Sequence, residues 1–359
     1  MDASLIIPRF PLVARPRPAC LPIAERVQEI TVLSHEAERA QRFALASAAF
    51  NKAALLASDC GLPDLARTLC WRHADVYLRA QPLGARVARY GLEPLVNLAR
   101  LRIRSGDGEG AYRLLDSLFR AEKSGSNMVL DGRTVSFEHI TGSADDRRKL
   151  HQWLWTVLLA DGARALASAG RWSDALTQLR RHKGVGARML DGRQVAVVAG
   201  LTAGDMDEAE TLLRDTAPGE AWENAVTACL RVLCQREAGR PTDRDTNILL
   251  DQYRALDHPA ELAVFHTRLG LSVIDVTKEE AARLLTTHLV EQTMHDADGY
   301  AARDVLAHPT CVAYMTYQQS HHLRRTVEGC ALDHGAIPPD LSADLASALD
   351  TSEAVLSSR

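Results

Sequence analysis

The sequence predicts an all-α protein, an α-solenoid of about seven helix-turn-helix pairs with one short β-hairpin insertion. The main observation is a recurring turn, because Gly170–Ala175 returns 34 residues later as Gly204–Ala209. The same glycine-x4-alanine unit also occurs at Gly61–Ala66 and Gly106–Ala111. Helical patterns flank each copy, and a period in the thirties with two helices per unit is typical of stacked repeats.

Composition agrees with a helical chain. Apolar residues make up 46% of the sequence but aromatic residues only 5%, and alanine and leucine, the strongest helix formers, supply most of the rest. The net charge of −4 argues against a nucleic-acid or membrane footprint along the whole chain. The seven cysteines show no CxxC spacing, and no signal peptide or long apolar run precedes them. We therefore expect reduced thiols in a cytoplasmic protein.

The N-terminal part divides into an arm and two helix pairs. Residues 1–21 are expected to form an extended N-terminal arm, because prolines at 8, 11, 16 and 18, followed by Pro22 at the first helical position, hold φ and remove backbone donors. A helical pattern then runs over residues 22–59, and its partner covers 64–80 after the break at Gly61 and Pro63. The second pair is expected at 92–104 and 109–121.

Residues 125–145 interrupt the helical rhythm. Two short β-prone runs, 128–130 and 134–136, flank Asp131-Gly132, which is a favoured two-residue hairpin turn. A hairpin insertion here explains why Gly106 and Gly170 are 64 residues apart.

Regular helical patterns resume after the insertion. The remaining elements are expected at 148–183, 189–217, 221–256, 258–292 and 298–332. The solenoid is therefore expected to span residues 22–335. Residues 336–359 begin with two prolines and are rich in serine and aspartate, which predicts a weakly ordered tail.

Small residues recur at matching offsets from the turn glycine. They are Ala54, Ala99, Ala163 and Val197 in the first helices, and Ala66, Ala111, Ala175 and Ala209 in the second helices. With these positions, and with Trp172 two residues after its glycine, the units resemble tetratricopeptide (TPR) repeats over residues 40–217. The sequence departs from the family at a late alanine, where His73, Leu118, His182 and Thr216 stand instead.

The resemblance implies a non-catalytic scaffold that binds a peptide or protein partner on the concave surface of its first helices. Polar residues that map to this surface are Asn51, Lys52, Asn97, Arg100, Arg104 and Arg164. Such side chains can hold a peptide backbone or carboxylate through charge-assisted hydrogen bonds. By analogy of fold we expect a bacterial regulatory or accessory protein. We expect no cofactor and no membrane attachment, and no direct DNA binding because no DNA-reading domain precedes the repeats.

Two alternatives remain open at the level of the sequence. The chain could be an enzyme or enzyme subunit, with the hairpin insertion as a lid and a C-terminal metal site. The ligands would come from His308, Cys311, His321, His322, Cys330 and His334, whose spacing matches no known metal motif. The chain could also form a homo-oligomer through Trp153, Trp155 and Trp222. The sequence does not decide whether the arm fills the concave surface.

Overall fold

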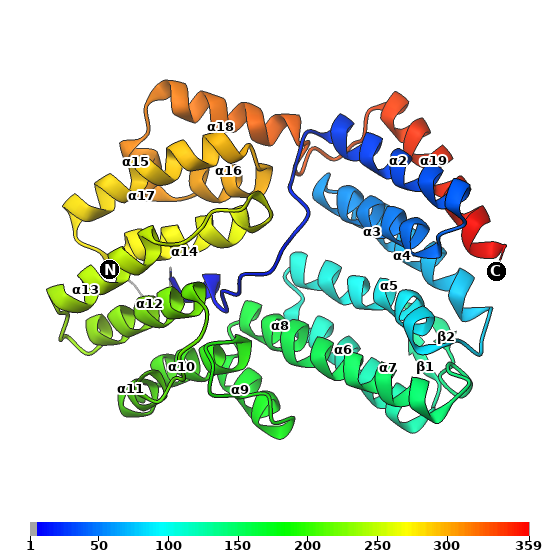
Figure 1. Ribbon diagram of the computed structural model, residues 1–359, viewed down its shortest axis with the longest axis horizontal. Coiled ribbons are helices and arrows are strands. Elements are labelled where there is room, and N and C mark those ends of the chain that lie inside the picture. Colours follow the sequence, from blue (N-terminus) through cyan, green and yellow to red (C-terminus); the bar gives the residue numbers. More distant parts are fainter. Residues whose placement is uncertain (1–5, 359) are drawn as a thin grey trace. The chain divides into compact units, whose positions relative to one another are not determined.

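The computed structural model describes residues 6–358 and is built almost entirely of helices (Figure 1). The prediction of an all-α chain is confirmed. Backbone contacts divide the chain into two compact units, where a single array over residues 22–335 was expected. Unit 1 combines Leu166–Cys330 with the N-terminal segment that ends at Leu21, and unit 2 combines Pro22–Ala165 with the C-terminal segment from Ala331 onwards.

Unit 2 consists of helices joined by short turns and one hairpin. Its elements are α2 (Ile23–Ala40), α3 (Phe43–Asp59), α4 (Pro63–Leu78), α5 (Ala85–Arg104), α6 (Gly108–Ser124), β1 (Met128–Leu130), β2 (Arg133–Val135), α7 (Ala144–Val157), the π-helical turn η2 (Leu158–Gly162), α8 (Ala163–Ser168), which continues across the unit boundary, and α19 (Pro339–Ser357). Consecutive helices from α2 to α6 pack on one another around a core of alanine, leucine and a few aromatic side chains.

Unit 1 contains the N-terminal arm and a second run of helices. Its elements are η1 (Ile7–Arg9), α9 (Trp172–Arg181), α10 (Asp191–Ala203), α11 (Met206–Arg214), α12 (Ala221–Glu237), α13 (Asp243–Arg254), η3 (Ala260–Leu262), α14 (Ala263–Val276), α15 (Glu279–Asp296), α16 (Gly299–Leu306), α17 (Pro309–Tyr314) and α18 (Tyr317–Gly329). None of the helices within residues 6–358 has the length and apolar character needed to cross a lipid bilayer.

The recurring sequence unit is a recurring turn in the structure. Its glycines, Gly61, Gly106, Gly170 and Gly204, are joined by Gly239, and all five have positive φ. At each turn the N–H of the next residue donates to the carbonyl five positions earlier, at 2.7–2.9 Å. This helix ending needs a left-handed residue, which glycine adopts without strain. The second-helix alanines, from Ala66 to Ala209, are all completely buried at the helix crossings.

We call the helix that precedes each of these turns a first helix. The first helices are α3, α5, the continuous stretch α7–η2–α8, α10 and α12. We count α14 and α16 with them, because α14 packs on the following α15 and α16 packs on α18.

The predicted hairpin is present, but its register differs by one residue from the expected one. Leu130 pairs with Arg133 and Met128 with Val135, because Asp131 and Gly132 alone form the turn and both have positive φ. Within unit 2, the hairpin contacts helix α4. Asp131 accepts a hydrogen bond from the indole of Trp71 at 3.0 Å, and the Arg133 guanidinium lies over the same ring at 4.8 Å.

The single helical pattern expected over residues 22–59 is two helices. The chain leaves α2 at Gln41, which has a φ of 46° and whose N–H donates to the carbonyls of Ala37 and Glu38. Glutamine is a good helix former, so nothing in the local sequence indicates this break.

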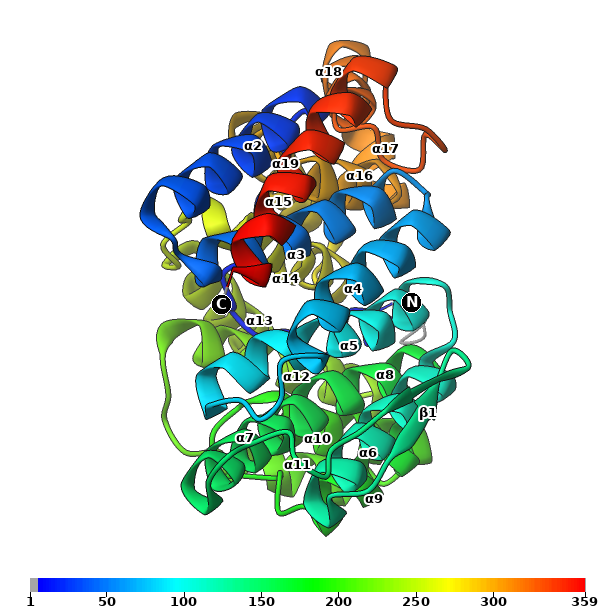
Figure 2. The same cartoon turned by 90° about the vertical axis from the view of Figure 1, so that its right-hand side faces the viewer.

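The prediction of a weakly ordered tail at residues 336–359 is wrong. Most of this segment is α19, which lies alongside α2 and α3 (Figure 2). Leu345, Leu349 and Leu356 are buried at helical spacing, while serine and aspartate occupy mainly the exposed face. The Ser34 hydroxyl also donates to the carbonyl of Ala348 at 2.6 Å. The amphipathic pattern therefore outweighs the polar composition.

Candidate functional site

A row of hydrogen-bonded polar side chains crosses three first helices of unit 2. Asn97 on α5 donates from Nδ2 to Oδ1 of Asn51 on α3 at 3.0 Å. Arg100 donates from Nη1 to Oδ1 of Asn97 at 2.9 Å. Its Nη2 and Nε hold the carboxylate of Asp161 in η2 at 2.9 and 3.3 Å. The structure thus brings three of the residues predicted from the sequence into one row, which ends on a carboxylate.

Asp161 is the member of this row that the sequence reasoning missed. It lies in the π-helical turn η2, and such turns shift the helical register and recur at functional sites. The Asp161 side chain is only 11% exposed, whereas that of Arg100 is 44% exposed. Burial lowers the pKa of Arg100, but the charge and hydrogen bonds of Asp161 outweigh this effect, and the pKa stays above its ordinary value. Arg100 is therefore charged, and nearly half of its side chain is exposed to solvent.

The other three predicted residues have separate surroundings. Lys52 makes a surface ion pair with a glutamate of α2 at 2.8 Å. Arg104 binds the buried carboxylate of Asp59 at 2.5 Å. Arg164 is half-buried on α8. Arg104 therefore has a structural task, since its loss would leave a buried carboxylate with one ion pair fewer.

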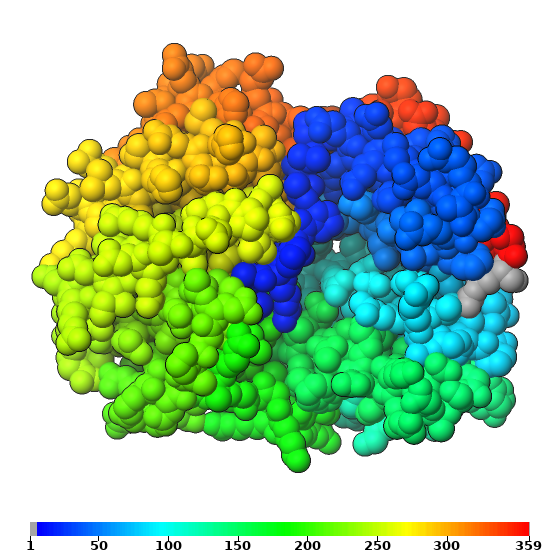
Figure 3. Space-filling model, in the orientation of Figure 1, coloured from blue at the N-terminus to red at the C-terminus, as the bar shows by residue number. Residues whose placement is uncertain are grey.

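The arm, residues 6–21, is bound in unit 1 through its backbone. Gln194 of α10 accepts the N–H of Leu12 at Oε1, at 2.6 Å, and donates from Nε2 to the Leu12 carbonyl at 2.7 Å. Further along, the Cys20 N–H donates to the carboxylate of Asp298 at 2.8 Å, and the Cys20 carbonyl accepts the N–H of Gly299 at 2.8 Å. Figure 3 shows the arm in dark blue beside the yellow surface of α14. These bonds recognise the backbone and are independent of the side chain at the bound position.

The arginines of the arm meet carboxylates on first helices. Arg9 binds Asp275 of α14 at 2.6 Å, and Arg15 binds Asp191 of α10 at 2.5 Å. The Arg17 guanidinium lies 5.5 Å from the centre of an aromatic ring on α16. Charge complementarity therefore fixes the arm where the backbone bonds hold it.

Besides Arg9 of the arm, Asp275 has a second partner, His308 at the start of α17. Nε2 of His308 lies 3.1 Å from Asp275, while Nδ1 of His308 accepts the N–H of Cys311 at 3.4 Å. The imidazole proton therefore sits on Nε2. Burial raises the pKa of Asp275, but hydrogen bonds from His308 and Arg9 outweigh burial and hold the pKa below its usual range. The carboxylate is consequently charged when it binds the arm.

Apolar side chains complete the arm's attachment. Phe10 and Leu12 are 4% and 3% exposed, and Cys20 is completely buried. Cys20 lies against Gly299, where an added Cβ would stand 3.1 Å from the Cys20 sulfur and 2.7 Å from that of Cys330. A glycine is needed at this position because both thiols occupy the space of a side chain.

The C-terminal histidines and cysteines do not converge on one point. His308 and Cys311 are engaged at the start of α17, and Cys330 donates to the Cys20 carbonyl at 2.9 Å. His334 belongs to unit 2, whereas the other residues of the proposed set belong to unit 1. Within residues 6–358, no group of three or more His, Cys, Asp or Glu side chains is placed to hold a metal ion.

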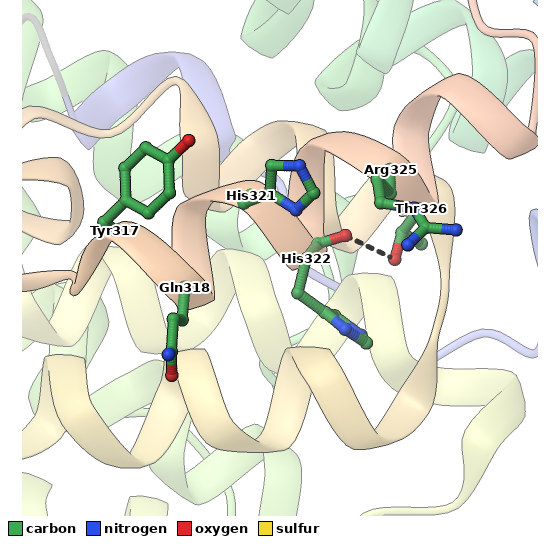
Figure 4. Close-up of a pocket in the computed structure, with 6 residues that line it drawn as sticks. All are labelled: Tyr317, Gln318, His321, His322, Arg325 and Thr326. Atoms are coloured by element: carbon green, nitrogen blue, oxygen red, sulfur yellow. Dashed lines mark hydrogen bonds between the residues drawn. The ribbon is translucent and has the colours of Figure 1, made fainter.

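His321 and His322 instead line an open hollow on the surface of α18 (Figure 4). The lining residues are Tyr317, Gln318, His321, His322, Arg325 and Thr326. All belong to one helix, and Tyr317 is 84% exposed. The hollow is therefore a shallow feature of one helix surface, without the convergent side chains of an enclosed site.

The tryptophans considered for self-association are partly buried. Trp153 and Trp155 pack against the core of unit 2. Trp222 on α12 meets Phe265 edge to face, with ring centres 5.9 Å apart. Most of their surface is thus used within the chain.

No protein-family model matches this chain, and no curated protein or solved structure matches it. The candidate functional surfaces of the chain are the polar row of unit 2 and the arm-binding surface of unit 1.

Proposed function

We propose that this chain is a non-catalytic, TPR-like α-solenoid scaffold of about seven helix pairs, which binds an extended segment of a protein partner on its first helices. The repeated turn and the buried alanines at the crossings support this arrangement, because they let each helix pair stack on its neighbour. The polar row and the arm-binding surface both lie on first helices, the helices that carry ligands in the family that the sequence resembles.

The observation that carries the proposal is the bound arm. Its chain is extended, its backbone is paired by the Gln194 amide, and two of its arginines are paired with Asp191 and Asp275. A peptide recognised by such a scaffold needs the same three contributions, namely backbone pairing, charge pairing and apolar anchors.

The polar row offers a comparable surface in unit 2. The Oδ1 of Asn51 is used within the row, but its Nδ2 has no hydrogen-bond partner within residues 6–358. Lys52 lies next to the row, with a side chain that is 26% exposed and paired with a glutamate of α2. Together these donors suit a peptide carbonyl or carboxylate. We also propose a cytoplasmic location, since all seven cysteines are free thiols. A regulatory or accessory role is proposed by analogy of fold.

A pull-down from native cell extract tests the proposal, using the full chain and an Asn51→Ala/Lys52→Ala variant. Alanine at these positions removes one amide hydrogen bond and one surface ion pair, so the fold should persist. Arg113→Ala is the matched control, because Arg113 makes a comparable surface ion pair on the second helix α6. Arg100 is unsuitable for this purpose, because its loss would strand Asp161.

We expect a protein retained by the wild type and by the control variant but lost by the double variant. Size-exclusion chromatography of the purified chain then tells whether the retained protein is a second copy. Equal retention by all three proteins, or retention by none, would contradict partner binding through the polar row.

A further inference from the structure

The arm-binding surface of unit 1 carries an inference about the chemistry of a ligand, which rests on the proposed scaffold function. We propose that this surface binds an extended, arginine-bearing segment of a partner protein, and that the chain's own arm is the intramolecular competitor for that segment. The arm would then regulate access to the surface by leaving it or staying bound.

The contacts of the arm define what the surface accepts. Gln194 is completely buried, and its Nε2 donates to the carbonyls of Leu12 and Met189. Its amide is therefore held in a fixed orientation, ready to pair with the N–H and carbonyl of one peptide residue. Any residue except proline can be paired in this way.

The charge of the surface selects a basic ligand. Residues 6–21 contain three arginines and no acidic residue. Two of them, Arg9 and Arg15, face the carboxylates of Asp275 and Asp191, which are 13% and 10% exposed. A carboxylate with so little access to water requires a cationic partner, so an acidic or neutral segment would leave it poorly compensated. In the bound arm, Arg9 and Arg15 are six positions apart and each reaches one of these two carboxylates.

The arm has the properties of an exchangeable ligand. Apart from the single turn η1, the arm (residues 6–21) contains no helix or strand. Its prolines restrict the unbound chain to extended conformations, which reduces the entropy lost on binding and equally favours an external proline-containing segment. A tethered competitor acts at a high effective concentration, so an external segment should bind weakly until the arm's own contacts are weakened.

A fluorescence-polarisation experiment on the full chain tests this proposal. The probe is a labelled synthetic peptide with the sequence of residues 6–19, which omits the Cys20 thiol. It is titrated with the wild type and with an Arg9→Ala/Arg15→Ala variant, whose arm is weakened while the binding surface is untouched. A peptide with glutamate in place of both arginines is the matched control probe.

We expect the peptide to bind the variant at least about tenfold more tightly than the wild type, because the competing arm has lost both ion pairs. The glutamate peptide should bind neither protein. Gln194→Ala in the variant background should weaken binding again, by about tenfold or more. A peptide that binds neither protein, or binds both equally, would overturn the inference.

A second measurement covers the case in which the variant does not fold. Hydrogen exchange of the wild type is recorded with and without about 1 mM peptide, close to the effective concentration of a tethered segment. Faster exchange at the Leu12 amide would support displacement of the arm, and unchanged exchange would overturn it. If the peptide fails while a partner is still retained through Asn51 and Lys52, the scaffold function stands and only the role of the arm falls.

Discussion

Acidification is expected to destabilise unit 2 through one buried side chain, His73 on α4. His73 is 1% exposed, and neither of its ring nitrogens has a hydrogen-bond partner within residues 6–358. The ring stacks on Phe50 with centres 5.2 Å apart and meets the edge of Tyr77 at 5.6 Å. It therefore behaves as a neutral aromatic residue, and a protonated imidazole would have no counter-charge in this contact shell.

Burial lowers the pKa of His73 from 6.5 to about 3. Below pH 6.5 the unfolded chain binds a proton that the folded chain does not. The stability associated with neutral His73 is thus fully present above pH 6.5 and is lost as the pH falls towards 3. Each pKa unit corresponds to about 1.4 kcal/mol, so the whole window amounts to about 5 kcal/mol. Between pH 6 and pH 4 this one residue should cost about 3 kcal/mol.

A His73→Leu variant isolates this contribution, because leucine has a similar volume and does not titrate. Urea unfolding of both proteins, followed by circular dichroism at pH 7, 6, 5 and 4, gives two curves of unfolding free energy against pH. The wild-type curve should fall more steeply by about 1.4 kcal/mol per pH unit below pH 6. Parallel curves would refute the reasoning, since they would mean that His73 has the same proton affinity in both states.

Three further predictions concern the two surfaces. Arg100→Ala should lower the free energy of unfolding by about 1–2 kcal/mol, because the nearly buried carboxylate of Asp161 loses its bidentate partner; an unchanged urea midpoint would contradict this. Gly299→Ala should cost about 1–3 kcal/mol, because the new Cβ would stand 2.7 Å from the Cys330 sulfur; a melting temperature equal to that of the wild type would exclude the steric argument. Asp275→Asn should loosen the arm and speed limited trypsin cleavage after Arg9, because that arginine loses its charged partner; equal cleavage rates would indicate that other contacts suffice.

Much of the helical framework could be predicted from the sequence, because local signals determine it. The turn glycines need positive φ, and the alanines at the crossings need to be small, so both leave a periodic mark on the chain. The break at Gln41 left no such mark, because a left-handed glutamine was stabilised by its carbonyl partners in α2. Helix α19 was not predicted, because the serine and aspartate residues on its exposed face mask the helical spacing of its buried leucines.

The candidate surfaces were only partly predictable, because they depend on contacts between distant residues. Asn51, Asn97 and Arg100 could be named from their offsets within the repeats. Asp161, which accepts the hydrogen bonds of Arg100, could not be named, since a π-helical turn shifts it out of the expected register. The pairing of Arg9 with Asp275 joins residues 266 positions apart, and no local pattern encodes it. Three arginines among prolines, with no acidic residue between them, were the available signal for the arm.

The interleaving of the two units along the chain has a consequence for synthesis on the ribosome. The arm is translated before the helices of unit 1, yet Asp298, which binds the Cys20 N–H, is made 278 residues later. In unit 2, helix α2 must wait for its partner α19, which is translated only after the helices of unit 1. Each unit therefore lacks part of its packing until a much later segment has been translated. The α2 face that α19 covers stays exposed in the meantime. Such a nascent chain should depend on chaperones that shield apolar helix surfaces, and expression of either half alone should yield an incomplete core.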